Sequence, residues 1–334
     1  MKILFVGDDW IGSNARSLAD GFRAAGHDVV VIDSTRVTLP ARLSASWTYS
    51  KAARRRAPWV VDRLHDEIDS VARDFRPDML FCYKTVHLDQ DRLLNVPAAL
   101  RVHYSADDVA NPYNITDAYL KSEHLWDLIV TTKRYNVPEV LGRGGKAALF
   151  VWSAYDPAWH FPAARRGRDH HRIGFIGACR DDRRDLMIRL GRRYGDDLLV
   201  QGPGWRRVAA LQATQAVVTG PAYGQEFSLA VAKVEANLVL LNSDNRDRHT
   251  CRTFEIPAAG GLFVGERTDE HAELLDDGTE CLLFSDEDEL HSQLALVREH
   301  PERASGIARA GHRRITEGGH RYLDRARQIV EEVT

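Results

Sequence analysis

Residues 252–264 read Arg-Thr-Phe-Glu-Ile-Pro-Ala-Ala-Gly-Gly-Leu-Phe-Val, and we expect them to form a short helix that leads into a buried strand. The apolar run 236–242 just upstream is typical of a buried parallel strand. A polar loop follows it, and Thr250 can then cap the helix. A helix that starts at the carboxyl end of a parallel strand presents backbone N–H groups and a positive dipole end. The stretch therefore predicts a phosphate site.

Two charged side chains near this helix start indicate what the site would hold. Arg252 adds a formal positive charge, whereas Glu255 lies one turn further on, where an unpaired carboxylate would repel phosphate. If Glu255 faces a ligand, it is suited to accept hydrogen bonds from sugar hydroxyls. The alternative is an ordinary surface helix, in which Glu255 only favours its own first turn.

Composition limits the classes of protein to consider. A length of 334 residues predicts two domains, and 44% hydrophobic with 28% charged residues is typical of a globular protein. The net charge of -3 argues against nucleic acid as a partner. No apolar run approaches the about 18 residues of a membrane span, so we expect no stable membrane insertion and a cytoplasmic protein. The four cysteines lack a C-x-x-C pair, and no histidine spacing indicates a metal site.

The first 33 residues predict a strand, a helix and a second strand, over residues 2–7, 14–25 and 28–33. This βαβ pattern indicates a parallel sheet. Further strands are expected at 79–83, 99–104, 127–131 and 147–152. The loop 8–13 lacks the glycines of a dinucleotide site and the lysine of a P-loop. A phospho-receiver domain is also excluded, because its acceptor aspartate would close the third strand and Asp78 precedes that strand.

Ligands of open α/β sheets collect at the carboxyl ends of the strands. The candidates there on the acceptor side are Gly12, Ser13, His103, Asp107 and Asp108. The two aspartates are equally suited to capping the segment that follows them. Residues 36–60 are expected to be irregular, and their basic run 51–56 either contacts an anionic acceptor or a membrane surface, or simply faces water.

A polar segment at 162–171 is interpreted as an interdomain linker, after which the βα pattern restarts. Strands are expected at 172–177, 197–201 and 216–219. Their carboxyl ends would bring Gly177, Arg183, Gly202 and Tyr223 to the edge that holds the helix start at 250–255. The combination predicts a cleft for a phosphorylated, aromatic ligand.

The whole pattern resembles the GT-B glycosyltransferases of group-1 type: two βαβ domains, a linker near the middle and a late F-E-x-P-A-x-G-G element. In particular it resembles the CgeB-like (spore maturation protein) family, through residues 252–261, Asp276-Asp277-Gly278 and the terminal stretch 320–326. The implied fold class is α/β, with two Rossmann-like domains facing across a cleft. We expect an acceptor-binding domain at 1–161, a nucleotide-sugar-binding domain at 172–318, and a C-terminal helix at 319–334 that packs back toward the first domain.

The resemblance also implies roles for single residues. Glu255 matches the second glutamate of the group-1 Glu-x7-Glu element, which holds the nucleotide ribose. The first falls on Asp247, one methylene shorter, so that Arg246, Arg248 or His249 are possible substitutes near the donor sugar. Arg183 matches the basic residue on the donor diphosphate. The helix-start contacts would come from Thr250, Cys251, Arg252 and Thr253.

The expected function is transfer of a sugar from a nucleoside-diphosphate sugar to a small-molecule, glycan or peptide acceptor, with no cofactor and no metal. The resemblance favours retention of configuration; inversion would need a base such as Asp108 or His103. Two alternatives stay open: a nucleotide-sugar 2-epimerase of the same fold, and a catalytically silent module that binds nucleotide. The donor base and sugar stay open, and the protein is either a monomer or a homodimer.

Overall fold

The computed structural model describes residues 1–164 and 171–334 and divides the chain into two compact units. The first unit comprises Met1–Trp152 with Tyr322–Thr334, and the second comprises Ser153–Arg321. The expected boundary at 161 differs from this division, because the N–H of Phe161 donates to Ser228 Oγ (3.0 Å) and so holds residues 153–161 on the second unit. The rest of the expected linker lies partly outside the described residues.

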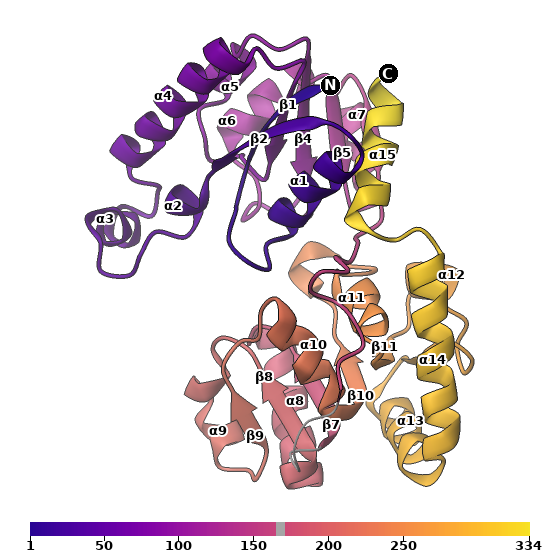
Figure 1. Cartoon of the computed structure of the whole chain (residues 1–334). Coiled ribbons are helices and arrows are strands. Elements are labelled where there is room, and N and C mark those ends of the chain that lie inside the picture. The colour runs from indigo at the N-terminus through magenta and orange to yellow at the C-terminus, as the bar shows by residue number, and fades with distance from the viewer. Residues whose placement is uncertain (165–170) are drawn as a thin grey trace. The chain divides into compact units, whose positions relative to one another are not determined.

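The first unit is built on a parallel sheet with the strand order β2-β1-β3-β4-β5-β6 (Figure 1). Its strands are β1 (Lys2–Gly7), β2 (Asp28–Asp33), β3 (Met79–Tyr83), β4 (Leu100–Ser105), β5 (Leu128–Thr131) and β6 (Ala148–Phe150). Its helices are α1 (Asn14–Ala24), α2 (Thr35–Thr38), α3 (Ala45–Ala53), α4 (Pro58–Phe75), α5 (Gln90–Leu94), α6 (Asp117–Ser122), α7 (Asn136–Gly142) and α15 (Tyr322–Val333).

The last helix, α15, completes the first unit by packing on α1. A side chain at Gly21 of α1 would lie 2.6 Å from the carbonyl oxygen of Tyr322, so the glycine permits the close approach of the two helices. Arg325 is buried, and its Nε donates to the carbonyl of Trp152 (2.9 Å). The end of the chain is therefore fixed to the unit that contains its beginning.

The second unit has the same architecture, with the strand order β12-β11-β10-β7-β8-β9. Its strands are β7 (His171–Ile176), β8 (Leu198–Gln201), β9 (Val217–Thr219), β10 (Val234–Val239), β11 (Leu262–Glu266) and β12 (Leu282–Phe284). Its helices are α8 (Asp181–Tyr194), α9 (Ala209–Gln212), α10 (Gln225–Ala232), α11 (Arg252–Ala258), α12 (Asp269–Leu274), α13 (Glu287–Glu299) and α14 (Pro301–Glu317). The strand pairs are parallel throughout the described part of the sheet.

The expectation of irregular structure at 36–60 is wrong. The segment contains α2, α3 and the start of α4. Ser44 caps α3 by accepting the N–H of Trp47 (3.1 Å), and Pro58 occupies the first turn of α4, where its missing N–H is not needed. Of the helices in the described residues, none combines the length and apolar character needed to cross a bilayer.

Candidate functional site

The strand order of the second sheet reverses between β7 and β10. From β7 the chain proceeds to β8 and β9 on one side, and then returns to place β10, β11 and β12 on the other. The loops that leave the carboxyl ends of β7 and β10 therefore run apart. In open parallel sheets this switch point is where ligands bind.

Two arginines reach the loop after β10 from the start of α8. The Nε of Arg180 donates to Asn242 Oδ1 (3.3 Å), and the Nε of Arg183 donates to the carbonyl of Leu241 (3.3 Å). Arg180 immediately precedes the helix, and Arg183 lies in its first turn. Each guanidinium group is thus held at the switch point by a hydrogen bond from its own Nε. This bond orients the remaining N–H groups of the same side chain.

Arg252 reaches the switch point from the other side. Its Nε donates to the carbonyl of Ile176, the last residue of β7 (3.1 Å), and its guanidinium lies 4.4 Å from the centroid of the Phe227 ring. The side chain is 32% exposed and forms an ion pair with Glu255. Stacking on an aromatic ring and pairing with a carboxylate fix a planar cation in one orientation. Arg252 therefore presents a preorganised positive charge.

Glu255 is buried, with 4% of its side chain exposed. One carboxylate oxygen pairs with Arg252, and the other lies 3.7 Å from His160 Nε2. The N–H of Asp156 donates to His160 Nδ1 (3.0 Å), so in the neutral ring Nε2 carries the proton and points it toward Glu255. Burial lowers the pKa of His160 below its usual value, which favours the neutral ring. Glu255 is therefore held from both sides.

The start of α11 differs from the expected phosphate cradle. The predicted cap at Thr250 is wrong: Cys251 is the N-cap residue of α11 and makes no side-chain capping bond. Thr250 Oγ1 accepts the N–H of Arg252 (3.2 Å), and the N–H of Thr250 donates to Thr253 Oγ1 (3.1 Å). Thr253 is fully buried, and its hydroxyl donates to His271 Nε2 (3.0 Å). Because the hydroxyls of Thr250 and Thr253 already form hydrogen bonds within the protein, they hold the start of α11 in place. The positive charge of the site comes from the arginine side chains instead.

Asp247, Arg183 and Glu266 line one pocket of about 300 Å³ at the ends of β10 and β11. Asp247 Oδ2 accepts the N–H of Asn242 (3.3 Å), and Glu266 Oε2 accepts the N–H of Leu241 (2.6 Å). Burial raises the pKa of Glu266 and lowers the pKa of Arg183. Arg183 thus lies among carboxylates, with Asp182 Oδ1 3.9 Å from its Nε, whereas Arg252 pairs directly with Glu255.

The three residues expected to be able to replace Asp247 near a ligand differ in their distance from its pocket. Arg246 lines the same pocket as Asp247. Arg248 instead pairs with Asp269 (3.1 Å). His249 is fully buried, with Nδ1 2.5 Å from Glu270 Oε2 and Nε2 accepting the N–H of Ser153 (3.2 Å). His249 is therefore a structural link to residue 153.

Gly177 and Gly202 follow β7 and β8 and make a close backbone contact. A Cβ on Gly202 would overlap the carbonyl oxygen of Gly177, which also accepts the indole N–H of Trp205 (2.8 Å). Tyr223, just before α10, is 46% exposed. The glycines let the two strand ends approach each other.

The acceptor-side candidates of the first unit mostly have structural roles. Ser13 caps α1 by accepting the N–H of Ala15 (3.2 Å) and donates to the carbonyl of Asp8 (3.0 Å). Gly12 has a positive φ of 91°, which the turn into α1 requires. Asp107 forms an ion pair with Lys84, which follows β3. These three residues lie at the carboxyl ends of β1 and β4, as expected from their positions after the strands.

Asp108 and His103 are placed unfavourably for a base. Asp108 is buried, and its Oδ1 accepts bonds from the N–H of Ala110 (2.9 Å) and from Asn136 Nδ2 (2.9 Å), so it fixes the loop after β4. His103 is fully buried in β4, with its ring 4.5 Å from that of Tyr119. Neither ring nitrogen of His103 has a hydrogen-bond partner, and burial lowers its pKa to about 3. His103 belongs to the core.

We expect His103→Leu to stabilise the protein while leaving its activity unchanged. A buried polar group without a partner costs about 1–3 kcal/mol, and leucine has a similar volume. The folded pKa of about 3 lies below the ordinary 6.5, so the unfolded chain binds the proton first. Stability is therefore complete above pH 6.5 and falls as the pH drops toward 3. Urea unfolding at pH 7 and pH 5 should show a smaller acid loss in His103→Leu than in the exposed control His124→Gln; an equal loss would contradict the assignment.

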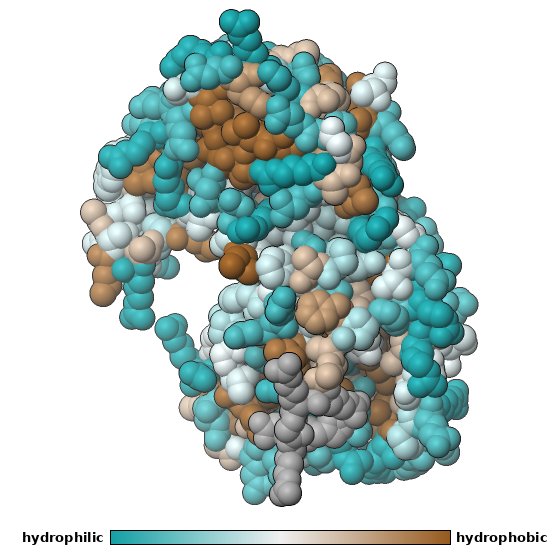
Figure 2. All heavy atoms as spheres, in the orientation of Figure 1, coloured by the Kyte–Doolittle hydropathy of each residue, from teal (hydrophilic) through white to brown (hydrophobic). Residues whose placement is uncertain are grey.

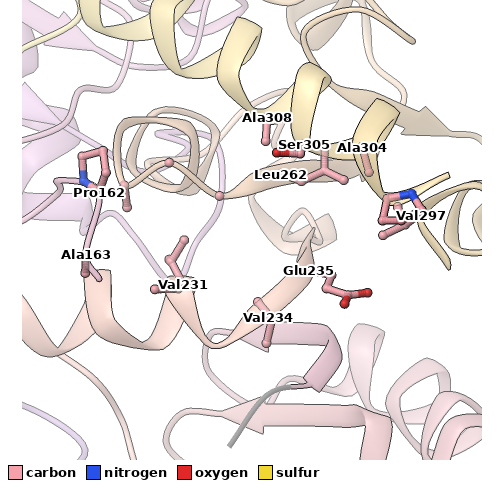
Figure 3. A pocket seen from close by; sticks show the side chains of 15 residues that line it. Pro162, Ala163, Val231, Val234, Glu235, Leu262, Val297, Ala304, Ser305 and Ala308 are labelled. Atoms are coloured by element: carbon pink, nitrogen blue, oxygen red, sulfur yellow. The ribbon is translucent and has the colours of Figure 1, made fainter. Parts of the chain in front are cut away.

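A separate pocket of about 310 Å³ lies in the second unit at the amino-terminal ends of β10 and β11 (Figure 3). Small apolar side chains of α10, β10 and α14 surround it, including Val231, Val234 and Ala304. Glu235 is the charged residue among its lining. Because this is the edge of the sheet opposite the switch point, the pocket is distinct from the arginine site.

Sequence reasoning missed three residues that shape the arginine site: His160, Arg180 and Phe227. Arg180 is signalled by its position three residues after Gly177, in a run of charged residues that starts α8. His160 lies 95 positions before Glu255, and no local pattern joins them. In the sequence, Phe227 is indistinguishable from an ordinary core residue of α10. Among the described residues, no group of three or more His, Cys, Asp or Glu is placed to hold a metal ion.

Residues 180–331 match the protein family described as glycosyl transferase-like. No curated protein matches the sequence. Among solved structures, the chain is similar to sucrose-phosphate synthase from Thermosynechococcus elongatus, with 11% identity, a TM-score of 0.69, and coverage of 100% of this chain and 98% of that one. It is also similar to Anabaena HepE in complex with UDP-glucose, with 13% identity, a TM-score of 0.67, and coverage of 100% and 99%.

A third similar structure is a UDP-N-acetylglucosamine 2-epimerase, with 15% identity, a TM-score of 0.59, and coverage of 100% of this chain and 95% of that one. At these identities the likeness concerns the fold. The predicted α/β class with two Rossmann-like domains of GT-B type is confirmed.

Proposed function

We propose that this protein is a glycosyltransferase that transfers a sugar from a nucleoside-diphosphate sugar to an acceptor, and that it is of the group-1, CgeB-like type. The observation that carries the proposal is the convergence of Arg180, Arg183 and Arg252 on the β7/β10 switch point of a Rossmann-like sheet. The family match over residues 180–331 covers the three arginines and the strands β8 to β12 of this sheet. Anabaena HepE, which is similar in fold, was crystallised with UDP-glucose.

The proposed chemistry follows from the charge that develops as the bond from sugar to diphosphate breaks. Negative charge grows on the departing phosphate, and preorganised cations stabilise it more than they stabilise the ground state. Arg252 is oriented by Phe227 and Ile176, and Arg180 by Asn242. We assign these two arginines to the diphosphate. Arg183, held by its bond to the carbonyl of Leu241, is assigned to the same diphosphate.

The proposed role of Glu255 is to accept hydrogen bonds from the ribose hydroxyls of the donor, with His160 as a positioning residue. The carboxylate is buried and held between Arg252 and His160, so its orientation is fixed before the ligand arrives. Asp247, in its pocket with Arg246, is assigned to the donor sugar. Gly177 and Gly202 would let the ligand approach the backbone, and Tyr223 would stack on the base.

Retention of configuration fits the first unit, since retaining transfer needs no strong protein base when the departing phosphate takes the acceptor's proton. His103 and Asp108, the two candidate bases, are occupied by structural roles. The acceptor is assigned to the first unit and is a small molecule, glycan or peptide. The protein acts in the cytoplasm as a monomer or homodimer.

Thermal-shift measurement against a panel of nucleotide sugars tests the proposal, together with assays for release of the free nucleoside diphosphate. A cognate donor at about 100 times its dissociation constant adds about 2.7 kcal/mol to stability. One member of the panel should stabilise the protein and be consumed when a suitable acceptor is added. A nucleotide that stabilises but is never turned over would indicate a silent binding module, and no stabilisation by any donor would overturn the proposal.

We further expect donor turnover to survive removal of divalent metal. Arg180 and Arg252 supply the positive charge in the proposed site, so a chelator should leave the initial rate within about twofold. The measurement is nucleoside-diphosphate release with EDTA and with added Mg²⁺ or Mn²⁺. A rate that collapses in EDTA and recovers only with metal would contradict this assignment.

A nucleotide-sugar 2-epimerase is the second candidate, because Asp247 and Glu266 line one pocket and the fold is similar to that of a UDP-N-acetylglucosamine 2-epimerase. The two functions differ in the fate of the sugar. Incubation of the donor in D₂O without acceptor, followed by NMR, would show deuterium at C2 for an epimerase. A transferase would leave the C2 proton in place.

A further inference from the structure

A cavity of about 950 Å³ opens in the first unit, separate from the arginine site of the second. Its walls come from α2, α3 and the start of α4, from residues 86–89 after β3, and from residues 113–116 after β4. It therefore lies at the carboxyl edge of the first sheet. A hydrogen bond from Thr116 Oγ1 to the carbonyl of Val86 (2.7 Å) joins two of these loops. The volume is at the upper end of the range for small-molecule sites.

The charge of the lining is positive. The basic residues are Lys51, Arg54, Arg55 and Arg56, and the acidic residues are Asp62 and Asp89. Asp89 is already occupied, because it caps α5 by accepting the N–H of Arg92 (3.1 Å). The net balance favours an anionic ligand.

Two of the basic side chains are fixed in place. The Nε of Arg55 donates to Tyr49 Oη (2.9 Å), and a terminal nitrogen of Arg56 donates to the carbonyl of Thr38 (2.9 Å). Arg56 is half-buried, and burial lowers its pKa. Lys51 and Arg54 are exposed and also line the cavity. Fixed guanidinium groups recognise carboxylate and phosphate with little further loss of entropy.

The lining also offers apolar surface and one unsatisfied polar atom. Tyr113 is 94% exposed and Leu39 is 59% exposed, although both line the cavity with Trp47. Figure 2 shows hydrophobic and hydrophilic atoms side by side on the part of the first unit where Figure 1 places α3. His87 Nε2 is buried and has no hydrogen-bond partner. A ligand with a polar group near His87 would satisfy it.

We propose that this cavity binds a small organic anion, a carboxylate or phosphate monoester attached to an apolar or aromatic body, and that this molecule is the acceptor. The word acceptor rests on the proposed function, whereas the binding of such an anion does not. The concave shape, with aromatic side chains in its lining, favours a small molecule over a flat membrane surface.

Calorimetric titration of the whole protein with phenyl phosphate tests the inference, with phenol and inorganic phosphate as partial probes. We expect phenyl phosphate to bind more tightly than either. The double variant Lys51→Gln/Arg54→Gln should weaken it about tenfold, since two of the four positive charges of the lining are lost. The control Arg73→Gln/Lys121→Gln removes the same charge from exposed positions elsewhere in the unit and should leave affinity unchanged. Tyr113→Ser should weaken phenyl phosphate but not inorganic phosphate.

Equal loss in the pocket variant and the control would mean general charge attraction, and no loss in either would place the probe elsewhere; each result overturns the inference. Binding of anionic phosphatidylserine vesicles that is lost in Lys51→Gln/Arg54→Gln, without binding of soluble phenyl phosphate, would also overturn it in favour of a membrane surface. Stabilisation by nucleotide sugars, measured on the same variants, should be unchanged. If wild-type protein binds phenyl phosphate in the cavity but no donor stabilises it, the proposed function fails and the anion site stands.

Discussion

Arg252→Ala is expected to remove nearly all stabilisation by the cognate nucleotide sugar. Arg252 is oriented by its ion pair with Glu255, and its side chain is 32% exposed, so a ligand can reach it. Loss of a charged contact to the diphosphate costs about 2–5 kcal/mol. A hundredfold loss of affinity reduces a wild-type stabilisation of about 2.7 kcal/mol to about 0.4 kcal/mol at the same ligand concentration. Differential scanning fluorimetry across a donor titration measures the change.

The same substitution leaves Glu255 buried without its partner, which by itself lowers the stability of the ligand-free protein by about 3–5 kcal/mol. The ligand-induced shift must therefore be compared with the ligand-free midpoint of each variant. Glu255→Ala should also abolish the shift, through loss of the acceptor for the ribose hydroxyls. The double variant Arg252→Ala/Glu255→Ala removes both charges together and should restore part of the ligand-free stability without restoring binding.

Arg184→Ala is the matched control for the arginine site. Arg184 is adjacent to Arg183 at the start of α8. Its guanidinium, however, pairs with Asp181 at the surface (2.6 Å). Exposed pairs of this kind contribute about 0–1 kcal/mol, so both stability and donor affinity should be nearly unchanged. A donor shift that persists in Arg252→Ala and in Glu255→Ala would remove the donor assignment.

The strands of both sheets could be predicted from the sequence because buried parallel strands consist of short runs of apolar residues. Residues 2–7 and 28–33 were predicted with their observed ends, and β7 and β10 differ from prediction by only a few residues. By contrast, α3 was missed: its residues mix serine, tryptophan and tyrosine, and none of them is buried, so no apolar stripe marks the helix. Capping by Ser44 stabilises the start of α3 instead, and residues of α3 line the cavity of the first unit.

Of the arginine site, only the residues that lie near strand ends or helix starts could be predicted from the sequence. Arg183, Arg252 and Glu255 follow strands or start helices, so topology brings them together. His103 was misjudged because a strand's last residues alternate between its two faces, and the sequence does not say which face meets Tyr119. His160 was missed because its contact with Glu255 depends on how residues 153–161 pack on the second unit. Such long-range placement is decided by the tertiary structure alone.

Gly202→Ala is expected to lower the stability of the protein by crowding the backbone between the ends of β7 and β8. The new Cβ would overlap the backbone carbonyl of Gly177 and lie 2.7 Å from its carbon, and backbone atoms cannot rotate away as a side chain can. Displacing that carbonyl also weakens its bond from the buried indole of Trp205 (2.8 Å). Overpacking and an unsatisfied N–H each cost about 1–3 kcal/mol, so we expect a loss of about 3 kcal/mol in total.

Gly220→Ala is the control, because a Cβ at Gly220 meets no atom within 4 Å. Its stability should stay within about 0.5 kcal/mol of wild type, whereas the midpoint of Gly202→Ala should fall by about 10 °C. Gly177 directly follows Ile176, whose carbonyl accepts the bond from Arg252 (3.1 Å). A shift of the backbone at Gly177 therefore reaches the arginine site, and Gly202→Ala should weaken donor binding as well. If Gly202→Ala matched Gly220→Ala in both measurements, the close approach of the β7 and β8 ends would not constrain the site.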